Sequence, residues 1–162
     1  MEKNKSGQQT MSMPFGIIFS IILIVVFIII AFIAVNHFLS IGDCSKVGQF
    51  YSDLQKEVNN VWNSQQANTT FKIDLPSGTE MICFANMTGT ITNKEKYDEF
   101  GSHIPEHTIV ILPDANSCNM PSYELVHINL AEITKDKNPY CVDVSRSLIL
   151  EKDFYDKYVT IR

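Results

Sequence analysis

An uninterrupted apolar run near the N-terminus constrains this chain more than any other feature. Residues 15–35, FGIIFSIILIVVFIIIAFIAV, contain no ionisable side chain. The small or polar residues within the run are Gly16, Ser20, Ala31 and Ala34. As an α-helix, 21 residues would be about 32 Å long, close to the thickness of the hydrocarbon core of a bilayer. The run predicts a transmembrane helix at residues 14–41, preceded by a short polar segment at residues 1–13.

A cleaved signal and a buried soluble helix both fit the apolar run less well than an anchor does. A secretory signal has an apolar core of roughly 7–15 residues followed by a cleavage site with small residues. This run is longer, and Ala31 and Ala34 lie inside it. A buried helix of a soluble domain would need apolar neighbours on every side, and a domain of about 120 remaining residues cannot supply them. We therefore expect the helix to stay in the mature protein as an anchor in the lipid bilayer.

The charges on either side of the run predict the orientation of the anchor. Two lysines and the α-amino group precede it against one glutamate, whereas Asp43 and Lys46 follow it. Basic residues favour the cytoplasmic side of a membrane. We therefore expect a single-pass protein of the cytoplasmic membrane, with a cytoplasmic N-terminus and a domain at residues 43–162 outside.

The charge of the C-terminal domain limits the classes of partner that it can bind. From Asp43 onward there are 11 Lys and Arg residues against 17 Asp and Glu residues, which gives a net charge of −6. An acidic surface disfavours binding to nucleic acid and to anionic lipid headgroups. We therefore expect no nucleic-acid partner.

The four cysteines all lie beyond the anchor. They are Cys44, Cys83, Cys118 and Cys141, and none forms a C-x-x-C pair. An even number of single cysteines in a small exported domain predicts two disulfides, each of which stabilises such a fold by about 2–4 kcal/mol. The alternative is four free thiols in a reducing compartment. Three pairings are possible, and the sequence does not choose among them.

Two N-x-T sequons are candidate glycosylation sites. They begin at Asn68 and Asn86, and the sequon is compatible with an exported protein. Both fall in stretches that we expect to be turns, where a glycan could be attached.

The segment that follows the anchor has the clearest helical period in the chain. Apolar residues recur at a spacing of three and four, which predicts an amphipathic helix at about residues 44–63. We expect one face of this helix to pack on a sheet, through Val47, Phe50, Tyr51, Leu54, Val58, Val61 and Trp62. Gly42 either breaks the helix after the anchor or is tolerated within it at a cost of about 1 kcal/mol.

Residues 70–162 are predicted to be rich in β-structure. We expect a polar linker before residue 71, then a hairpin from strands at 71–75 and 79–85, and then a charged surface loop at 92–102. A central strand at 108–112 and a further strand at 123–130 should follow. The chain should end with a hairpin within 141–154 that turns at Ser145–Arg146, and with a final helical turn or edge strand. The predicted fold is therefore α+β, with a transmembrane helix and then an amphipathic helix packed on a small, mostly antiparallel sheet that carries disulfides.

The sequence contains no pattern that indicates catalysis. His103 and His107 flank Glu106 at a spacing that would suit a metal pair on a helix, but Pro105 makes a helix there unfavourable. We expect His127 to be a hydrogen-bonded structural residue. No nucleophile, metal or nucleotide motif is present. We therefore assign no catalytic, cofactor-binding or metal site and no cofactor, and we expect a protein that is not an enzyme.

Segments of this sequence resemble two families of proteins. The segment NKSGQQTMSMPFGIIF resembles the leader of archaeal class III prepilins, in which cleavage after a glycine leaves an apolar helix on the mature protein. The resemblance implies processing between Gly7 and Gln8, and assembly with copies of itself or other pilin-like subunits through that helix. The segments YSDLQKEVNNVWNSQ, LPSGTEMICFAN and NPYCVDV resemble a family of small uncharacterised archaeal membrane proteins, which implies no activity.

We therefore expect a membrane-anchored structural or interaction protein, pilin-like or minor-pilin-like. The first alternative is an anchored binding module of an envelope complex, which would expose an apolar or aromatic patch on the sheet face away from the amphipathic helix. The second alternative is an ectoenzyme, which would need a cleft that gathers His103, His107 or His127 with carboxylates or a thiol.

Overall fold

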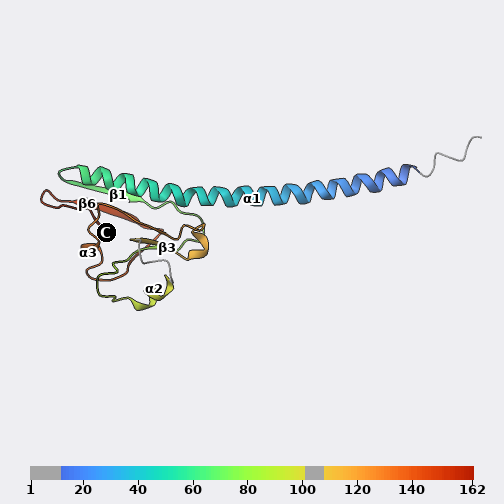
Figure 1. Cartoon of the computed structure of the whole chain (residues 1–162). Coiled ribbons are helices and arrows are strands. Elements are labelled where there is room, and N and C mark those ends of the chain that lie inside the picture. The colour runs from blue at the N-terminus through green and yellow to red at the C-terminus, as the bar shows by residue number, and fades with distance from the viewer. Residues whose placement is uncertain (1–11, 101–107) are drawn as a thin grey trace, which may run out of the picture. The chain divides into compact units, whose positions relative to one another are not determined.

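One long helix dominates the chain. The computed structural model describes residues 12–100 and 108–162, and helix α1 (Ser12–Asn63) is the first element in it (Figure 1). The chain divides into two compact units, Met1–Ile41 and Gly42–Arg162. Gly42 lies within α1, so this glycine is tolerated in the helix and does not break it.

The part of α1 that belongs to the first unit is apolar and exposed. Every residue from 15 to 39 is exposed, and no lysine, arginine, aspartate or glutamate occurs there. Within the part of the chain that the structure describes, α1 is the one helix long and apolar enough to cross a membrane. A helix that is apolar on all sides and has no protein around it requires another apolar environment.

Two antiparallel sheets form the β-structure in the described part of the second unit. The first has the strand order β1-β6-β7, with bounds β1 (Ala67–Lys72), β6 (Ser147–Lys152) and β7 (Thr160–Ile161). The second has the order β4-β3-β2-β5, with bounds β4 (Ser122–Tyr123), β3 (Ile109–Leu112), β2 (Met81–Phe84) and β5 (Tyr140–Asp143). The described residues of this unit also form three short helices, namely α2 (Lys94–Glu99), the 3₁₀ helix η2 (Asp114–Asn116) and α3 (Leu130–Ile133). The fold is α+β, as predicted.

The predicted packing face of α1 forms the centre of the main core. Six of its seven residues are buried, and Trp62 is half-buried. They pack against both sheets, including Ile82 and Phe84 of β2 and Leu148 and Leu150 of β6. Burial of a complete stripe of large side chains makes α1 part of the domain's hydrophobic core.

The opposite face of the four-stranded sheet is covered as well. Side chains alternate along β2, so that Cys83 points away from α1 and joins a second cluster with Val110, Leu112 and Phe100. Phe100 directly follows α2, whose first turn is capped by the Asn93 side chain at the Lys96 amide, 3.3 Å away. The prediction of a loop at residues 92–102 was wrong over Lys94–Glu99, because this cap and the anchoring Phe100 stabilise one short helix.

Two predicted hairpins do not form. Residues 71–75 and 79–85 were expected to pair, but β1 pairs with β6 while β2 pairs with β3 and β5. The stretch expected to be a linker already contains the start of β1 at Ala67. Likewise, β5 and β6 are joined through a turn at residues 144–146, yet they belong to different sheets. In both places the chain passes from one sheet to the other, although a hairpin within one sheet was predicted.

The remaining strand predictions had mixed outcomes. The central strand at 108–112 is confirmed, since all four residues of β3 are buried between β2 and β4. The strand at 123–130 was wrong beyond Tyr123, because His127 has a φ of 67° and Leu130 begins α3. A positive φ in a residue other than glycine interrupts an extended strand. At the C-terminus, the edge-strand alternative is the one that forms, as β7.

Candidate functional site

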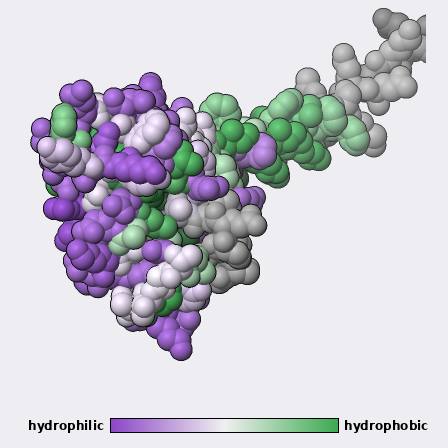
Figure 2. All heavy atoms as spheres, turned by 60° about the vertical axis from the view of Figure 1, so that its left-hand side comes forward, coloured by the Kyte–Doolittle hydropathy of each residue, from purple (hydrophilic) through white to green (hydrophobic). Residues whose placement is uncertain are grey.

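One face of the second unit is mostly hydrophilic. Figure 2 shows polar side chains over much of the visible face of the domain and apolar side chains along the N-terminal part of α1. Four features of the second unit are candidates for function: its two disulfides, a groove beside α1, an exposed aromatic turn and the two sequons.

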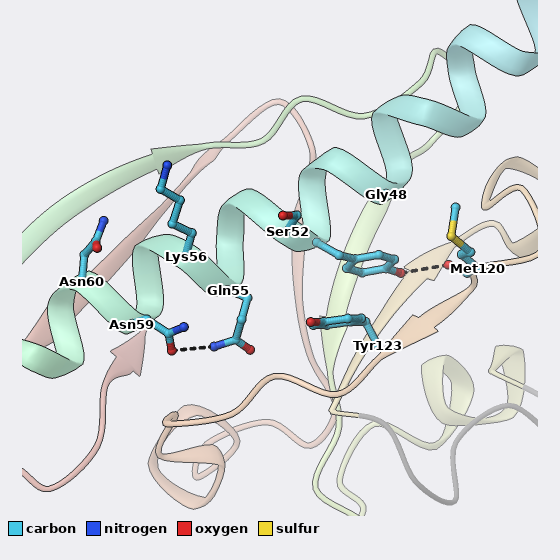
Figure 3. Close-up of a pocket in the computed structure, with 9 residues that line it drawn as sticks. Gly48, Ser52, Gln55, Lys56, Asn59, Asn60, Met120 and Tyr123 are labelled. Carbon is cyan, nitrogen blue, oxygen red and sulfur yellow. Dashed lines mark hydrogen bonds between the residues drawn. The ribbon is translucent and has the colours of Figure 1, made fainter.

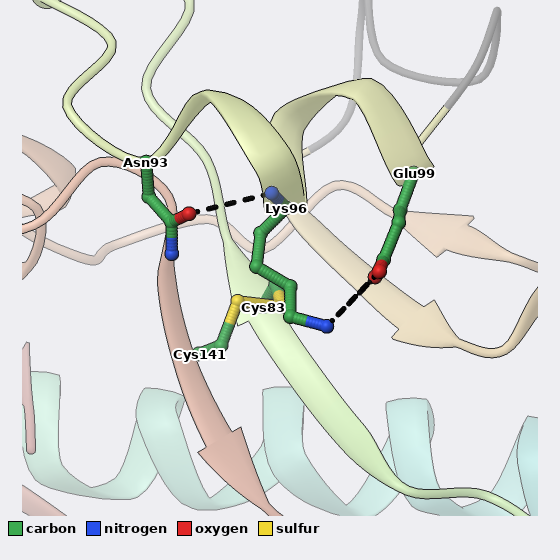
Figure 4. The surroundings of a disulfide bond; sticks show 5 residues. All are labelled: Cys83, Asn93, Lys96, Glu99 and Cys141. Carbon is green, nitrogen blue, oxygen red and sulfur yellow. Dashed lines mark hydrogen bonds and ion pairs between the residues drawn. A yellow bond between two sulfur atoms is a disulfide. The ribbon is translucent and has the colours of Figure 1, made fainter.

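Both predicted disulfides form, with the pairing Cys44–Cys118 and Cys83–Cys141. Cys83 and Cys141 lie directly opposite each other on neighbouring strands, with their Cα atoms 4.0 Å apart. Figure 4 shows this bond beneath α2, where the Lys96 ammonium donates to the Glu99 carboxylate at 2.9 Å. That hydrogen bond raises the pKa of Lys96. Cys83 is fully buried and Cys141 is half-buried, so this disulfide lies at the margin of the second hydrophobic cluster.

The second disulfide joins the domain part of α1 to a distant loop. Cys44 lies in α1, and Cys118 follows η2, 74 positions later in the sequence. Cys118 has a φ of 55°, so the loop turns sharply at the cysteine itself. Both residues are half-exposed. The bond holds the segment that runs from Cys118 through Met120 to Tyr123 of β4 against α1, and Met120 and Tyr123 form one wall of the groove described next.

A groove of about 470 Å³ runs beside α1. Figure 3 shows Gly48, Ser52, Lys56 and Asn60 along the helix and Met120 and Tyr123 on the facing segment. The rings of Tyr51 and Tyr123 stack with their centroids 4.9 Å apart and their planes at 16°. The Tyr51 hydroxyl donates to the Met120 carbonyl at 3.0 Å.

The polar groups of this groove are largely engaged within the fold. The Gln55 amide binds the Val126 backbone in both directions, at 3.0 Å and 3.3 Å, and donates to Asn59 at 2.9 Å. Burial raises the pKa of Tyr51 above its ordinary value, so its hydroxyl stays protonated at neutral pH. A neutral phenol and paired amides can hold a loop in place, but they supply neither a nucleophile nor a general base.

Two of the four histidines, His37 and His127, lie in the part of the chain that the structure describes. His127 is hydrogen-bonded, as predicted: its Nδ1 lies 3.0 Å from Asn59 Oδ1, and its ring stacks on Trp62. His37 is exposed on α1. His103 and His107 lie outside the described residues, so the expectation that they do not form a metal pair on a helix stays a prediction. Among residues 12–100 and 108–162, no group of three potential metal ligands comes together.

A turn with two exposed aromatic side chains was missed in the sequence. It joins β6 to β7, where the Asp156 amide donates to the Asp153 carbonyl at 3.0 Å and the Asp153 amide donates to the Asp156 carboxylate at 3.1 Å. Between them, Phe154 is 61% exposed and Tyr155 is 94% exposed. We call residues 153–156 the aromatic turn. The pattern DFYD, two aromatics between aspartates, was the signal that could have identified it.

The aromatic turn is fixed to the C-terminal end of α1. Gln66, just beyond the helix, donates to the Asp153 carboxylate at 3.1 Å, and the Trp62 indole donates to the Lys157 carbonyl at 3.1 Å. The Lys152 ammonium donates to the Trp62 and Ser64 carbonyls at 2.7 Å and 2.8 Å. These contacts hold the backbone in place while they leave both aromatic rings in solvent.

The two sequons occupy different local structures. Asn68 lies in β1 with an exposed side chain, so the expected turn at this position was wrong. Asn86 follows β2 and begins a turn, as predicted. The predicted processing site, Gly7 and Gln8, lies outside the described residues.

No known protein family, curated protein or solved structure matches this chain at a significant level of similarity.

Proposed function

We propose that this chain is a single-pass protein of the cytoplasmic membrane that holds its α+β domain outside the cell and acts as a non-enzymatic, pilin-like structural or interaction subunit. The main support for the proposal is that two parts of α1 have different surroundings. One part of this helix exposes only uncharged residues from 15 to 36, and another part supplies the core of the domain.

The external location is supported by the cysteines. Every cysteine is in a disulfide, and all four lie beyond the apolar part of α1. Disulfides persist in oxidising compartments and are rare in the cytosol. The lysines at positions 3 and 5, before the apolar part, favour a cytoplasmic N-terminus.

Assembly through α1 is supported by the exposed apolar surface of this helix. In a membrane, lipid covers that surface, and in a filament the same helices of neighbouring subunits would cover it. The resemblance of residues Lys5, Gly7 and Gln8 to a prepilin leader points to the second arrangement. Copies of this chain or related subunits are then the partners.

The mature N-terminus tests the pilin-like assignment. We expect mass spectrometry of the protein purified from its own membranes to find Gln8 as the first residue, and blue-native electrophoresis to show assemblies of several copies. A Gly7→Leu variant should keep its leader and fail to assemble, whereas Ser12→Ala, outside the cleavage position, should be processed. An intact Met1 on a protein that migrates as a monomer would contradict the pilin-like role.

The aromatic turn favours a second candidate, an anchored binding module. The expected patch on the outer sheet face is not found among the described residues, because Phe100 and Tyr97 cover the four-stranded sheet and the exposed face of β1 and β6 is polar except for Ile149. The exposed aromatics lie on the turn at residues 153–156 instead. Loss of a co-migrating protein on blue-native gels in Phe154→Ala/Tyr155→Ala, but not in Ile149→Ala, would support this function.

The ectoenzyme alternative has less support. His127 is engaged with Trp62 and Asn59, and no histidine or carboxylate among the described residues lines the groove beside α1. His103 and His107 lie outside the described residues.

A further inference from the structure

The turn that begins at Asn86 has a well-defined geometry for a sequon. Asn86 Oδ1 accepts from the Thr88 backbone amide at 3.0 Å and from the Thr88 hydroxyl at 2.8 Å. The Gly89 amide closes the turn by donating to the Asn86 carbonyl at 3.2 Å. A backbone N–H can only donate, which identifies the acceptor atom of the carboxamide as the oxygen and places the nitrogen on the other side.

A buried asparagine holds this turn in place. Asn138 is 2% exposed, and its Oδ1 accepts from the Asn86 amide at 2.9 Å. Its Nδ2 donates to the Asn86 carbonyl at 2.7 Å and to the Thr90 carbonyl at 3.3 Å. Both backbone polar groups of Asn86 are therefore fixed by one side chain, and the turn does not depend on the sequon residues alone.

The Asn86 carboxamide nitrogen is the free atom of this arrangement. Nδ2 donates to none of the described residues, and it is not among the buried side-chain atoms that lack a partner. Residues 87–89 around it are exposed. A side chain at position 89 would crowd this nitrogen, since a Cβ there would lie 3.2 Å from Asn86 Nδ2 and 3.3 Å from Asn138 Nδ2, and glycine avoids that contact. The nitrogen is thus accessible from solvent in a fixed orientation.

The Asn68 sequon lacks these features. Asn68 and Thr70 lie two positions apart in β1 and pair with Glu151 and Ile149 of β6. Residues two apart in a strand are separated by about 6.6 Å along it, too far for the Thr70 hydroxyl to hold the Asn68 carboxamide. An enzyme would have to pull β1 away from β6 to bend this sequon.

We propose that Asn86, and not Asn68, is an N-glycosylation site of the folded domain. In the transfer, Asn86 Nδ2 forms a bond to the anomeric carbon of an oligosaccharide carried on a polyprenyl phosphate lipid. The bond between that carbon and the phosphate oxygen breaks, the lipid phosphate leaves with the electron pair, and Nδ2 gives up one proton, which the released phosphate takes up in the net reaction. The donor lipid and the membrane transferase that uses it are the required partners.

Glycosylation of Asn86 rests on the proposed external location of the domain, because such transfer takes place on the outer side of the membrane. The full-length chain, produced in its own host and purified from membranes, is digested and its peptides are analysed by mass spectrometry. We expect the peptide that contains Asn86 to carry a glycan and the peptide that contains Asn68 to be unmodified.

Four variants test which residues of the two sequons the glycan requires. The glycan should disappear in Asn86→Gln and in Thr88→Ala, persist in Thr88→Ser, which keeps the hydroxyl, and be unchanged in Asn68→Gln. Near-ultraviolet circular dichroism of each variant reports whether the fold is retained, and the Thr88→Ala and Thr88→Ser pair compares two exposed substitutions at one position. Glycan at Asn68 alone, or full occupancy in Thr88→Ala, would overturn the inference.

Protease treatment of intact cells separates glycosylation of Asn86 from the proposed function. If the domain is digested in intact cells but Asn86 carries no glycan, the glycosylation inference fails and the external location stands. If the domain is protected until the membrane is broken, both fail. A digested domain with a glycosylated Asn86 supports both.

Discussion

The indole ring of Trp62 lies flat on the imidazole ring of His127, with the ring centroids 3.7 Å apart and the planes at 2°. The pair connects the C-terminal end of α1 to the loop between β4 and α3. His127 reaches this position with a φ of 67°, and its Nδ1 lies 3.0 Å from Asn59 on the same helix. One side chain thus makes a stacking contact and a hydrogen bond to α1 from a backbone conformation that most residues avoid.

Replacement of His127 tests how much this contact contributes. Stacking contributes about 0.5–1.5 kcal/mol and the hydrogen bond about 1 kcal/mol. We expect His127→Ala to lower the free energy of unfolding by about 2 kcal/mol and His127→Asn by about half as much, because asparagine tolerates a positive φ. Trp62, the one tryptophan in the chain, gives a fluorescence signal for urea unfolding of the full-length protein in detergent. Equal stability of His127→Ala and the unsubstituted protein would show that the stack contributes nothing.

The two disulfides should differ in their access to reductant. Cys44, Cys118 and Cys141 are all half-buried, whereas Cys83 is fully buried beside Phe100. One sulfur of the Cys83–Cys141 bond is therefore shielded from solvent, and neither sulfur of the Cys44–Cys118 bond is shielded to that extent. A thiolate has to reach a sulfur atom to attack it. We expect dithiothreitol, added to the folded protein, to open Cys44–Cys118 first, as seen by alkylation and peptide mass spectrometry over time.

The double variant Cys44→Ala/Cys118→Ala provides the control for that experiment. It keeps only the Cys83–Cys141 bond, so its remaining disulfide should be reduced at the slow rate, and the fast phase should disappear. A fast phase that survives in this variant would show that reductant reaches the Cys83–Cys141 bond first.

Local periodicity explains which parts of the fold could be predicted from the sequence. The stripe from Val47 to Trp62 repeats at the period of one helix, and its burial follows from that pattern alone. The pairing of strands depends on residues far apart in the chain. Eight residues separate Lys72 from Met81, which is enough to return as a hairpin or to cross to another sheet, and the local pattern is the same in both cases.

Two further differences between prediction and structure have equally specific causes. Alternation from Tyr123 to Leu130 suggested a strand, but the positive φ of His127 is set by its contacts with α1 and cannot be read from neighbouring residues. Motifs identify candidate sites in a sequence, and the aromatic turn carries no established motif. It is recognised only when Phe154 and Tyr155 are seen to be exposed beside a fixed backbone.

Asn138 should be among the most sensitive polar positions of the domain. Its side chain makes three hydrogen bonds to backbone groups of Asn86 and Thr90, and its backbone amide donates to Thr92 Oγ1 at 2.8 Å. Removal of a buried partner costs about 1–3 kcal/mol for each group left unpaired. We expect Asn138→Ala to lower the free energy of unfolding by at least about 2 kcal/mol, measured by urea unfolding.

The helix-capping residue Asn129 is a useful comparison for Asn138. Its side chain caps α3 through a hydrogen bond of 3.2 Å to the Glu132 amide, so Asn129→Ala should cost only about 1 kcal/mol. If the two variants were equally stable, the network around Asn138 would be no more important than an ordinary helix cap.

Tyr51 should make the stability of the domain depend on alkaline pH. Burial raises its pKa in the folded state, while the unfolded chain ionises near pH 10. Its contribution is therefore complete below the unfolded pKa and is lost as the pH rises toward the folded pKa, because only the unfolded state releases the proton. Tyr51→Phe removes this group, at the cost of about 1 kcal/mol for the hydrogen bond to Met120.

We expect urea unfolding at neutral pH to show Tyr51→Phe as the less stable protein, and the difference in the free energy of unfolding to shrink above pH 10. Tyr155→Phe, which changes an exposed ring, should leave the pH profile unchanged. A constant difference between Tyr51→Phe and the unsubstituted protein across the alkaline range would contradict a buried, protonated phenol at this position.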